Sequence, residues 1–221
     1  VENIDNMFTN CSSLESLNLD NFDTSKVENM GNLFSNCNNL KSLNLFTFIT
    51  SRVKNMENMF SNCYSLENLT INNFDASLVT NMENMFYNCK KLINFNYFYF
   101  KTSGVINMRN MFNGCSSLID LDLSNFYTSN LMYMENLFSN CSSLEEISLS
   151  NFITSRVQSF ENIFSNCSSL QSVDIHTFIT TEVINMENMF LGCKQLKSIN
   201  TLTNFDTSKV INMKTMFCDC A

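Results

Sequence analysis

The chain has 221 residues, a net charge of −8 and an apolar fraction of 44%, which suits one or two globular domains. The acidic charge disfavours nucleic-acid binding, because an acidic chain repels a phosphate backbone. No apolar run approaches the roughly 18 residues that a bilayer requires. We find no signal peptide either, but the first residues lie within a repeat, so we expect the true N-terminus to be missing.

A repeat of 26 residues organises the chain. Its clearest marker is a Cys at positions 11, 37, 63, 89, 115, 141, 167 and 193, followed after 27 residues by one at 220. Each repeat reads C-x-x-L-x-x-L-x-L-x-x-F-x-T-S-x-V-x-N-M-x-N-M-F-x-N. We therefore expect a single solenoid domain over 1–221. Its repeats would be 11–36, 37–62, 63–88, 89–114, 115–140, 141–166, 167–192 and 193–219, with truncated repeats at both ends.

The first predicted element of each repeat is a short strand. Leu17 and Leu19, like Leu43 and Leu45, alternate with polar residues, which is typical of a strand with one buried face. Equivalent strands would stack in a parallel sheet, about 4.8 Å apart. One extra residue between Ile199 and Phe205 predicts a bulge.

The second predicted element is a short helix after the Thr-Ser pair. Val27, Met30 and Phe34 lie at helical spacing, and residues 25–28 and 155–158 have the pattern of a capping box. The chain has no Pro and only four Gly, so Asn, Ser and Asp must make its corners. The residue before the Cys is usually Asn, but Gly at 114 and 192, which predicts a left-handed backbone there.

The segment C-x-x-L-x-x-L-x-L followed by N-F-D-T-S-x-V-x-N-M-x-x-M-F resembles the BspA-like leucine-rich-repeat surface proteins, in particular their surface lipoprotein repeat of about 25 residues. Residues 21–25 and 58–60 match closely, and the resemblance covers the whole chain. It implies an α/β repeat solenoid, a right-handed leucine-rich-repeat-like stack with a parallel sheet on one face and short helical turns on the other. It also implies an extracellular or cell-surface location, adhesion to a protein or glycan on another cell or matrix, and no catalytic residues.

Ten cysteines allow two interpretations. Neighbouring turns would place Cα atoms about 5 Å apart, which permits disulfides. One Cys at a fixed core position in each turn instead favours a column of buried free thiols, and we expect this for Cys63, Cys89, Cys115 and Cys141. A straight column of sulfurs cannot surround zinc tetrahedrally. Whether Cys218 and Cys220 form a bridge stays open.

Nothing in the sequence supports catalysis or a cofactor. His176 is the only histidine, and strand parity points it outward. We find no P-loop, no Gly-rich turn and no metal-ligand cluster, so we expect no enzyme, no cofactor and no metal site.

The candidate binding face consists of the outward strand positions beside the Leu columns. Two of them are aromatic, and the others are carboxylates and the histidine: Phe46, Phe98, Asp120, Asp122, Glu146, Asp174 and His176. A chain rich in Phe places a few such rings on its surface without function. Alternatively, these residues form an aromatic anchor beside an acidic patch, which would suit a basic or sugar-bearing partner.

Two polar columns accompany the predicted helix. Asn residues such as Asn29 and Asn32 recur and should hydrogen-bond along the stack. Glu57, Glu83, Glu135, Glu161 and Glu187 form an acidic stripe, either a solvated face or a track for cations or a basic partner.

These observations favour a cell-surface binding module. The alternative is a structural spacer or filament that associates end to end, because uncapped repeats expose apolar edges. A third hypothesis, an ice-binding array of Thr side chains, is weaker, because helix capping would already occupy those hydroxyls.

Overall fold

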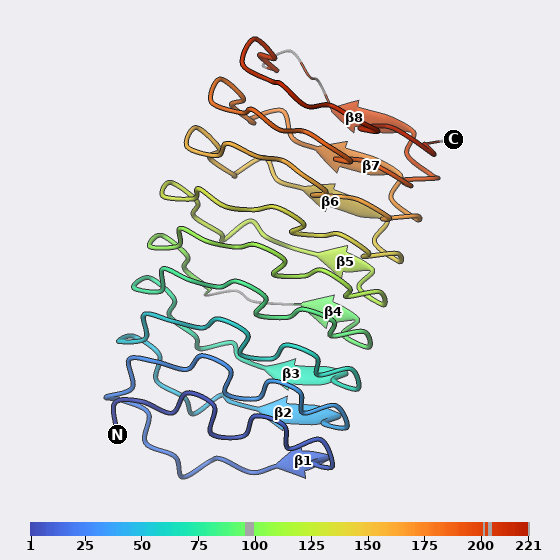
Figure 1. Ribbon diagram of the computed structural model, residues 1–221. Helices are drawn as coiled ribbons and strands as arrows, with labels where there is room; N and C mark the ends of the chain where they lie inside the picture. The colour runs from blue at the N-terminus through green and yellow to red at the C-terminus, as the bar shows by residue number, and fades with distance from the viewer. Residues whose placement is uncertain (96–99, 201, 203–204, 221) are drawn as a thin grey trace.

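The computed structural model describes residues 1–95, 100–200, 202 and 205–220. Each turn contributes one short strand, and the turns stack along a single axis with the chain ends at opposite ends of the stack (Figure 1). The strands are β1 (Ser16–Leu17), β2 (Ser42–Asn44), β3 (Asn68–Thr70), β4 (Asn94–Phe95), β5 (Asp120–Leu121), β6 (Glu146–Ser148), β7 (Ser172–Asp174) and β8 (Ser198–Asn200). The predicted leucine-rich-repeat-like solenoid with parallel strands is confirmed.

The strands pair in the register that the repeat predicts. Leu43 lies opposite Leu69, and Val173 lies opposite Ile199. The buried fraction alternates as expected, since Leu43 is 3% exposed between two exposed neighbours. Within the described residues the sheet is divided into β1–β2–β3, β4–β5 and β6–β7–β8.

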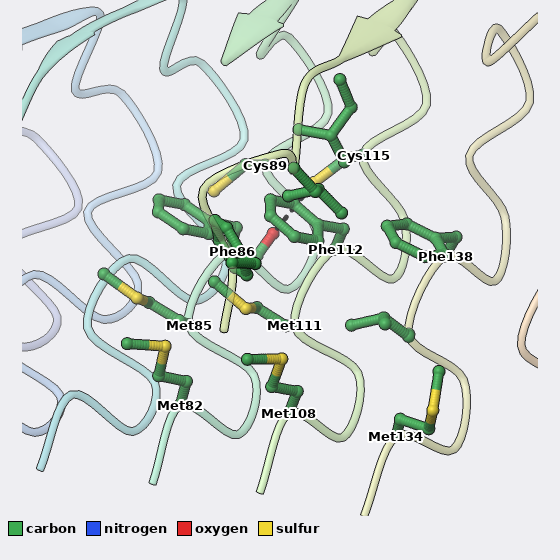
Figure 2. Close-up of a cluster of buried hydrophobic side chains, with 14 of the residues drawn as sticks. Met82, Met85, Phe86, Cys89, Met108, Met111, Phe112, Cys115, Met134 and Phe138 are labelled. Carbon is green, nitrogen blue, oxygen red and sulfur yellow. Dashed lines mark hydrogen bonds between the residues drawn. The ribbon is translucent and has the colours of Figure 1, made fainter. Parts of the chain in front are cut away.

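The core is a set of side-chain columns that run along the stack. Rings of the second Phe of each repeat lie nearly parallel, with centroids 5.5 Å apart for Phe86 and Phe112 and 5.8 Å apart for Phe112 and Phe138. Figure 2 shows these rings above two columns of Met side chains, with Cys89 and Cys115 beside them. Each turn buries its apolar face only against its two neighbours, which is the general property of solenoids.

The predicted helix is wrong. The described residues contain no helix, and residues 27–36 with their equivalents, which we call the return segment, form successive turns. In one return segment Ser61 N donates to Asn58 O at 3.0 Å, whereas Asn58 N donates to Glu83 O of the next turn at 2.9 Å. Because alternate amides bond to a neighbouring turn, they cannot form the i to i−4 bonds of an α-helix.

Left-handed Asn residues explain why the return segment is not helical. Asn62 has a φ of 60°, which confirms the left-handed residue predicted before each Cys. Asn58 has a φ of 53°, and the sequence analysis did not predict this second left-handed position. Two residues at positive φ within five interrupt any right-handed helix.

The predicted capping boxes therefore have no helix to cap. The Thr ahead of each return segment instead bonds to the next turn, as Thr24 shows. Its Oγ1 accepts from Ile49 N at 2.7 Å and donates to Ile49 O at 3.1 Å.

The return segments carry a second ladder on the side of the stack opposite the strands (Figure 1). Its isolated parallel bridges run from Asn3 through Asn29, Asn55, Asn81 and Asn107 to Tyr133, and resume from Ser159 through Asn185 to Asn212. Neighbouring turns are therefore joined by main-chain bonds on two opposite sides. Most of the bulge predicted between Ile199 and Phe205 lies outside the described residues.

Candidate binding surface

The four predicted carboxylates lie in one groove on the exposed side of the strands, which we call the strand-face groove. Asp120, Asp122, Glu146 and Asp174 come from the three neighbouring turns of β5, β6 and β7 and line a hollow of about 460 Å³. Asn151 and the serines Ser124, Ser148, Ser150 and Ser172 complete the polar lining, and no Lys or Arg is among the described lining residues. The groove therefore presents negative charge without a neutralising cation of its own.

His176 lies at one end of this acidic group and contacts Asp174. Its Nδ1 is 2.7 Å from Asp174 Oδ1, and its backbone N donates to the same oxygen at 3.3 Å. Burial alone would raise the pKa of Asp174, but the hydrogen bonds from His176 outweigh it and hold the pKa below its usual value. Backbone donation from Ser124 similarly lowers the pKa of Asp122. Both carboxyls therefore remain ionised well into the acid range.

Asn151 is a groove residue that the sequence analysis missed. Its Nδ2 donates to Leu123 O at 2.9 Å and to Phe126 O at 2.8 Å, both in the preceding turn. The side chain thus satisfies carbonyls at the end of the β5 turn, where β6 does not pair with β5. The recurring Asn-Phe pair at residues 21–22, 73–74 and 151–152 was the available signal.

The structure does not bring the predicted aromatic residues to this groove. Phe46 is 53% exposed, as predicted, but follows β2, three turns and about 14 Å from β5. Its backbone is fixed by Asn44 Oδ1, which accepts from Phe46 N at 3.0 Å. Phe98 lies outside the described residues. A joint aromatic and acidic site is therefore not assembled by the described residues.

The cysteine column is made of free thiols, and Cys63, Cys89, Cys115 and Cys141 are buried, as predicted. Each of these thiols donates to a main-chain carbonyl 29 residues earlier: Cys115 Sγ donates to Phe86 O at 3.2 Å (Figure 2). Burial raises the pKa of the Cys115 thiol to about 12. Cys218 and Cys220 are also free, and Cys220 Sγ joins the same column by donating to Phe190 O at 3.1 Å.

The described residues contain no group of His, Cys, Asp or Glu side chains that could hold a metal ion.

Of the two predicted Asn columns, the one with Asn29 joins neighbouring turns, since Asn55 Nδ2 donates to Asn29 Oδ1 at 3.1 Å, whereas Asn58 Nδ2 of the other column donates to Glu57 of its own turn. The Asn residues before each Cys form a further column: Asn62 Nδ2 donates to Asn36 Oδ1 at 2.9 Å, and Asn88 Nδ2 donates to Asn62 Oδ1 at 3.0 Å. Glu57 of the acidic stripe accepts from Asn81 Nδ2 of the next turn at 2.9 Å. The stripe thus has a structural role, because its carboxylates join neighbouring turns.

The buried Thr column removes the ice-binding hypothesis. Thr24, Thr50, Thr102, Thr128, Thr154 and Thr180 are at most 2% exposed. Their hydroxyls hydrogen-bond to the main chain of the next turn instead of forming a flat external array.

With the repeat geometry established, comparison with known proteins assigns the chain to a family. Residues 2–120 and 107–221 match the family described as Mycoplasma protein of unknown function, DUF285. The chain belongs to the DUF285 family. No curated protein matches this DUF285 chain.

Several solved structures are similar to the DUF285 chain. A leucine-rich cell surface protein from Faecalibacterium prausnitzii is 20% identical with a TM-score of 0.36, and the match covers 88% of this chain and 69% of that one. A leucine-rich repeat protein from Bacteroides ovatus is 20% identical with a TM-score of 0.44, covering 93% and 67%. The T. pallidum leucine-rich repeat protein is 18% identical with a TM-score of 0.42, and the match covers 80% of this chain but only 64% of that one.

The resemblance to leucine-rich-repeat surface proteins expected from the sequence is thus confirmed for the repeat type. These identities and TM-scores say nothing of what the DUF285 chain binds. Among the described residues there is no helix with the length and apolar character to cross a membrane.

Proposed function

We propose that this chain is a non-catalytic binding module of a cell surface, and that its strand-face groove takes a positively charged segment of another protein. The observation that carries the proposal is the convergence of Asp120, Asp122, Glu146 and Asp174 on one hollow. Complementary charge raises the rate of encounter and excludes partners of like charge. The surface location rests on the resemblance of the repeat to surface proteins.

The groove suits an extended segment better than a compact ligand. Its carboxylates are distributed over three turns, so they lie about 5 to 10 Å apart along the stack. Successive same-side residues of an extended peptide are about 6.6 Å apart, so basic residues at alternate positions could meet successive turns. We propose further that residues 1–221 act as one solenoid domain that displays this face.

Binding of labelled peptides tests the proposal. Peptides of equal length rich in Lys, in Glu or in Ser would be titrated against the chain and followed by fluorescence anisotropy at low and high salt. The Lys-rich peptide should bind, and added salt should weaken its binding, because exposed charges are screened. Equal binding of the Lys-rich and Glu-rich peptides would contradict the proposal.

A matched pair of variants separates the groove from net charge. Asp122→Asn with Glu146→Gln removes two groove carboxylates, whereas Glu67→Gln with Glu182→Gln removes two carboxylates elsewhere. The groove variant should lose about tenfold in affinity, equivalent to about 1.4 kcal/mol, while the control loses little. Equal losses would show that general charge and not the groove attracts the peptide. A chain that binds no peptide and forms rods with rising concentration in light scattering would instead be the structural spacer.

A further inference from the structure

Both hydrogen-bonded sides of the stack are interrupted at the same junction, between the fifth turn (residues 115–140) and the sixth turn (residues 141–166). On the strand side, β5 and β6 belong to different sheets. One main-chain bond remains there, from Glu145 N to Ile119 O at 3.4 Å, which is as long as its equivalent from Ile119 N to Ile93 O beside the paired strands β4 and β5. The strand ladder is therefore interrupted at this point, where the side chain of Asn151 bonds to Leu123 O and Phe126 O instead.

The return side loses two main-chain bonds at this same junction. At an intact junction, that of the third and fourth turns, Ile106 N donates to Thr80 O at 2.9 Å, and Met82 N donates to Asn107 O at 2.9 Å. Equivalents of both bonds occur at every other junction of the described residues, but Gln158 N does not reach Met132 O, and Met134 N does not reach Ser159 O. The ladder of bridges is interrupted between Tyr133 and Ser159.

The gap between β3 and β4 provides an internal comparison. Those strands also belong to different sheets, yet the return side of that junction is intact, with Ile106 N donating to Thr80 O at 2.9 Å. Within the described residues, only the junction of the fifth and sixth turns combines a divided sheet with missing main-chain bonds on the return side. When main-chain bonds are lost on one side only, the ladder on the opposite side still fixes the angle between the two turns. When they are lost on both sides, no complete ladder fixes this angle.

The cause lies in two residues that replace the usual Asn. Asn107 Oδ1 accepts from the backbone N of Arg109 at 3.0 Å, which fixes the return segment locally. Tyr133 has no such acceptor, and its ring instead lies 4.0 Å from the Arg109 guanidinium. Arg109 is held in turn by Glu135 at 2.8 Å. At the facing position Ser159 Oγ reaches Glu161 N at 3.2 Å, so a shorter side chain keeps only this local bond.

Besides the side-chain bonds of Asn151 and Thr128, the fifth and sixth turns are joined near one edge and in the core. Asn140 N donates to Ser165 O at 2.7 Å, and Phe138 N donates to Ile163 O at 2.9 Å. The rings of Phe138 and Phe164 stack with centroids 5.7 Å apart. Side-chain stacking tolerates small rotations better than main-chain bonds, because dispersion is not directional whereas hydrogen bonds weaken steeply with angle.

We infer that the junction between the fifth and sixth turns is a hinge, about which the two parts of the solenoid rock on the edge formed by residues 136–140. Among the hollows that span this junction are the strand-face groove and a pocket of about 270 Å³ on the return side that Tyr133, Arg156 and Ser159 help to line. Rocking of the two parts of the solenoid changes the width of both the groove and the pocket. The hinge follows from the hydrogen bonds alone and does not depend on the proposed function.

Matched distance measurements on the intact chain test the hinge. Spin labels would be attached through unnatural amino acids, which avoids the ten cysteines, at exposed positions of one column. The pair Ser103 and Thr181 spans three junctions including the hinge, whereas the pair Ser51 and Ser129 spans three junctions without it. The Ser103–Thr181 distance distribution should be about twofold broader. Equal widths would overturn the inference, and this comparison needs no change at the hinge.

Reciprocal variants test the cause. Tyr133→Asn with Ser159→Asn should narrow the Ser103–Thr181 distribution to the width of the control pair. Asn81→Tyr with Asn107→Ser places the same change at the junction where only the sheet is divided, and should broaden the Ser51–Ser129 distribution. If neither width changes in variants that keep the parent circular dichroism spectrum, Tyr133 and Ser159 do not create a hinge.

Discussion

The return segment and the strand segment of the same turn differ sharply in how much they vary. Return segments repeat Val, Met, Phe and Asn at nearly fixed positions, and in the inner turns the Val, Met and Phe side chains of these columns are buried. The outward strand positions instead hold Asp20, Phe46, Ser124, Ser150 and His176 in equivalent places. Side chains that must match two neighbouring turns are restricted, whereas those that face solvent are free to differ. Any property that distinguishes one turn from another therefore lies mainly on the strand side.

The largest effect on stability is expected from alkaline pH, which acts on the buried cysteine column. Burial raises the pKa of Cys37 to about 11 and of Cys193 to about 12, and holds the pKa of Cys89, Cys141 and Cys167 well above the ordinary value. Unfolded thiols ionise near pH 8.5, so above this pH the folded chain binds more protons than the unfolded chain. The free energy of unfolding should then fall with rising pH, by about 1.4 kcal/mol per pH unit for each buried thiol.

Urea denaturation between pH 7 and pH 10.5 measures this slope. Cys115→Ala provides a matched variant, because it removes one thiol whose pKa is raised to about 12. Its slope against pH should be smaller than that of the parent by about one thiol. A free energy of unfolding that does not change across this pH range would show that the thiols of the cysteine column are not both buried and protonated.

Truncation of a core ring should have the next largest effect. Phe112 is 1% exposed and lies between Phe86 and Phe138 in the stack. Phe112→Ala should reduce the free energy of unfolding by about 3–5 kcal/mol, because a buried aromatic leaves a cavity. Hydrogen exchange should show the damage spreading outward from this turn, since turns contact only their neighbours. A loss below about 1 kcal/mol would place the column outside the core.

A left-handed Asn should be less costly to replace, and the cost should depend on the replacement. Asn62→Ala puts a Cβ residue at a φ of 60° and removes amide bonds to Asn36 and Asn88, so a loss of about 1–3 kcal/mol is expected. Asn62→Gly removes the same amide without the strain and should cost less, as Gly114 and Gly192 occupy this column naturally. Thermal denaturation of both variants checks the order, and equal losses would show that the amide alone matters.

The smallest effect on the free energy of unfolding is expected for substitutions at outward strand positions. Phe46→Ser removes a ring that is 53% exposed and should change the free energy of unfolding by less than about 0.5 kcal/mol. Phe48→Ser, two residues along, removes a ring that is 2% exposed and should cost several times more. Similar losses for the two variants would mean that the two sides of the turn do not differ as described.

The sequence predicts the period, the strands and the inward Leu columns because each of these depends on local alternation that recurs in every turn. It fails at the return segment, where Val27, Met30 and Phe34 have helical spacing although the backbone is not helical. Apolar spacing reports only which side chains face the core. The conformation here is decided by Asn residues at positive φ and by amides that bond to the next turn, and neither is visible in spacing.

The groove was predictable only in part. Strand parity placed Asp120, Asp122, Glu146 and Asp174 outward, and adjacency of turns then put them together. Asn151 and the interruption between β5 and β6 could not be deduced in this way. Both depend on hydrogen bonds between particular turns, which strand parity does not report.

The two ladders also determine how the solenoid responds to force. Their main-chain bonds join one turn to the next, so they run along the stack and bear a load applied to its ends directly. A turn occupies about 4.8 Å of the folded stack, but its 26 residues span about 90 Å when extended. Under tension the chain should therefore lengthen in steps of whole turns, beginning where the fifth and sixth turns share the fewest bonds. A solenoid that links two surfaces would therefore lengthen by unfolding single turns before the link between the surfaces is lost.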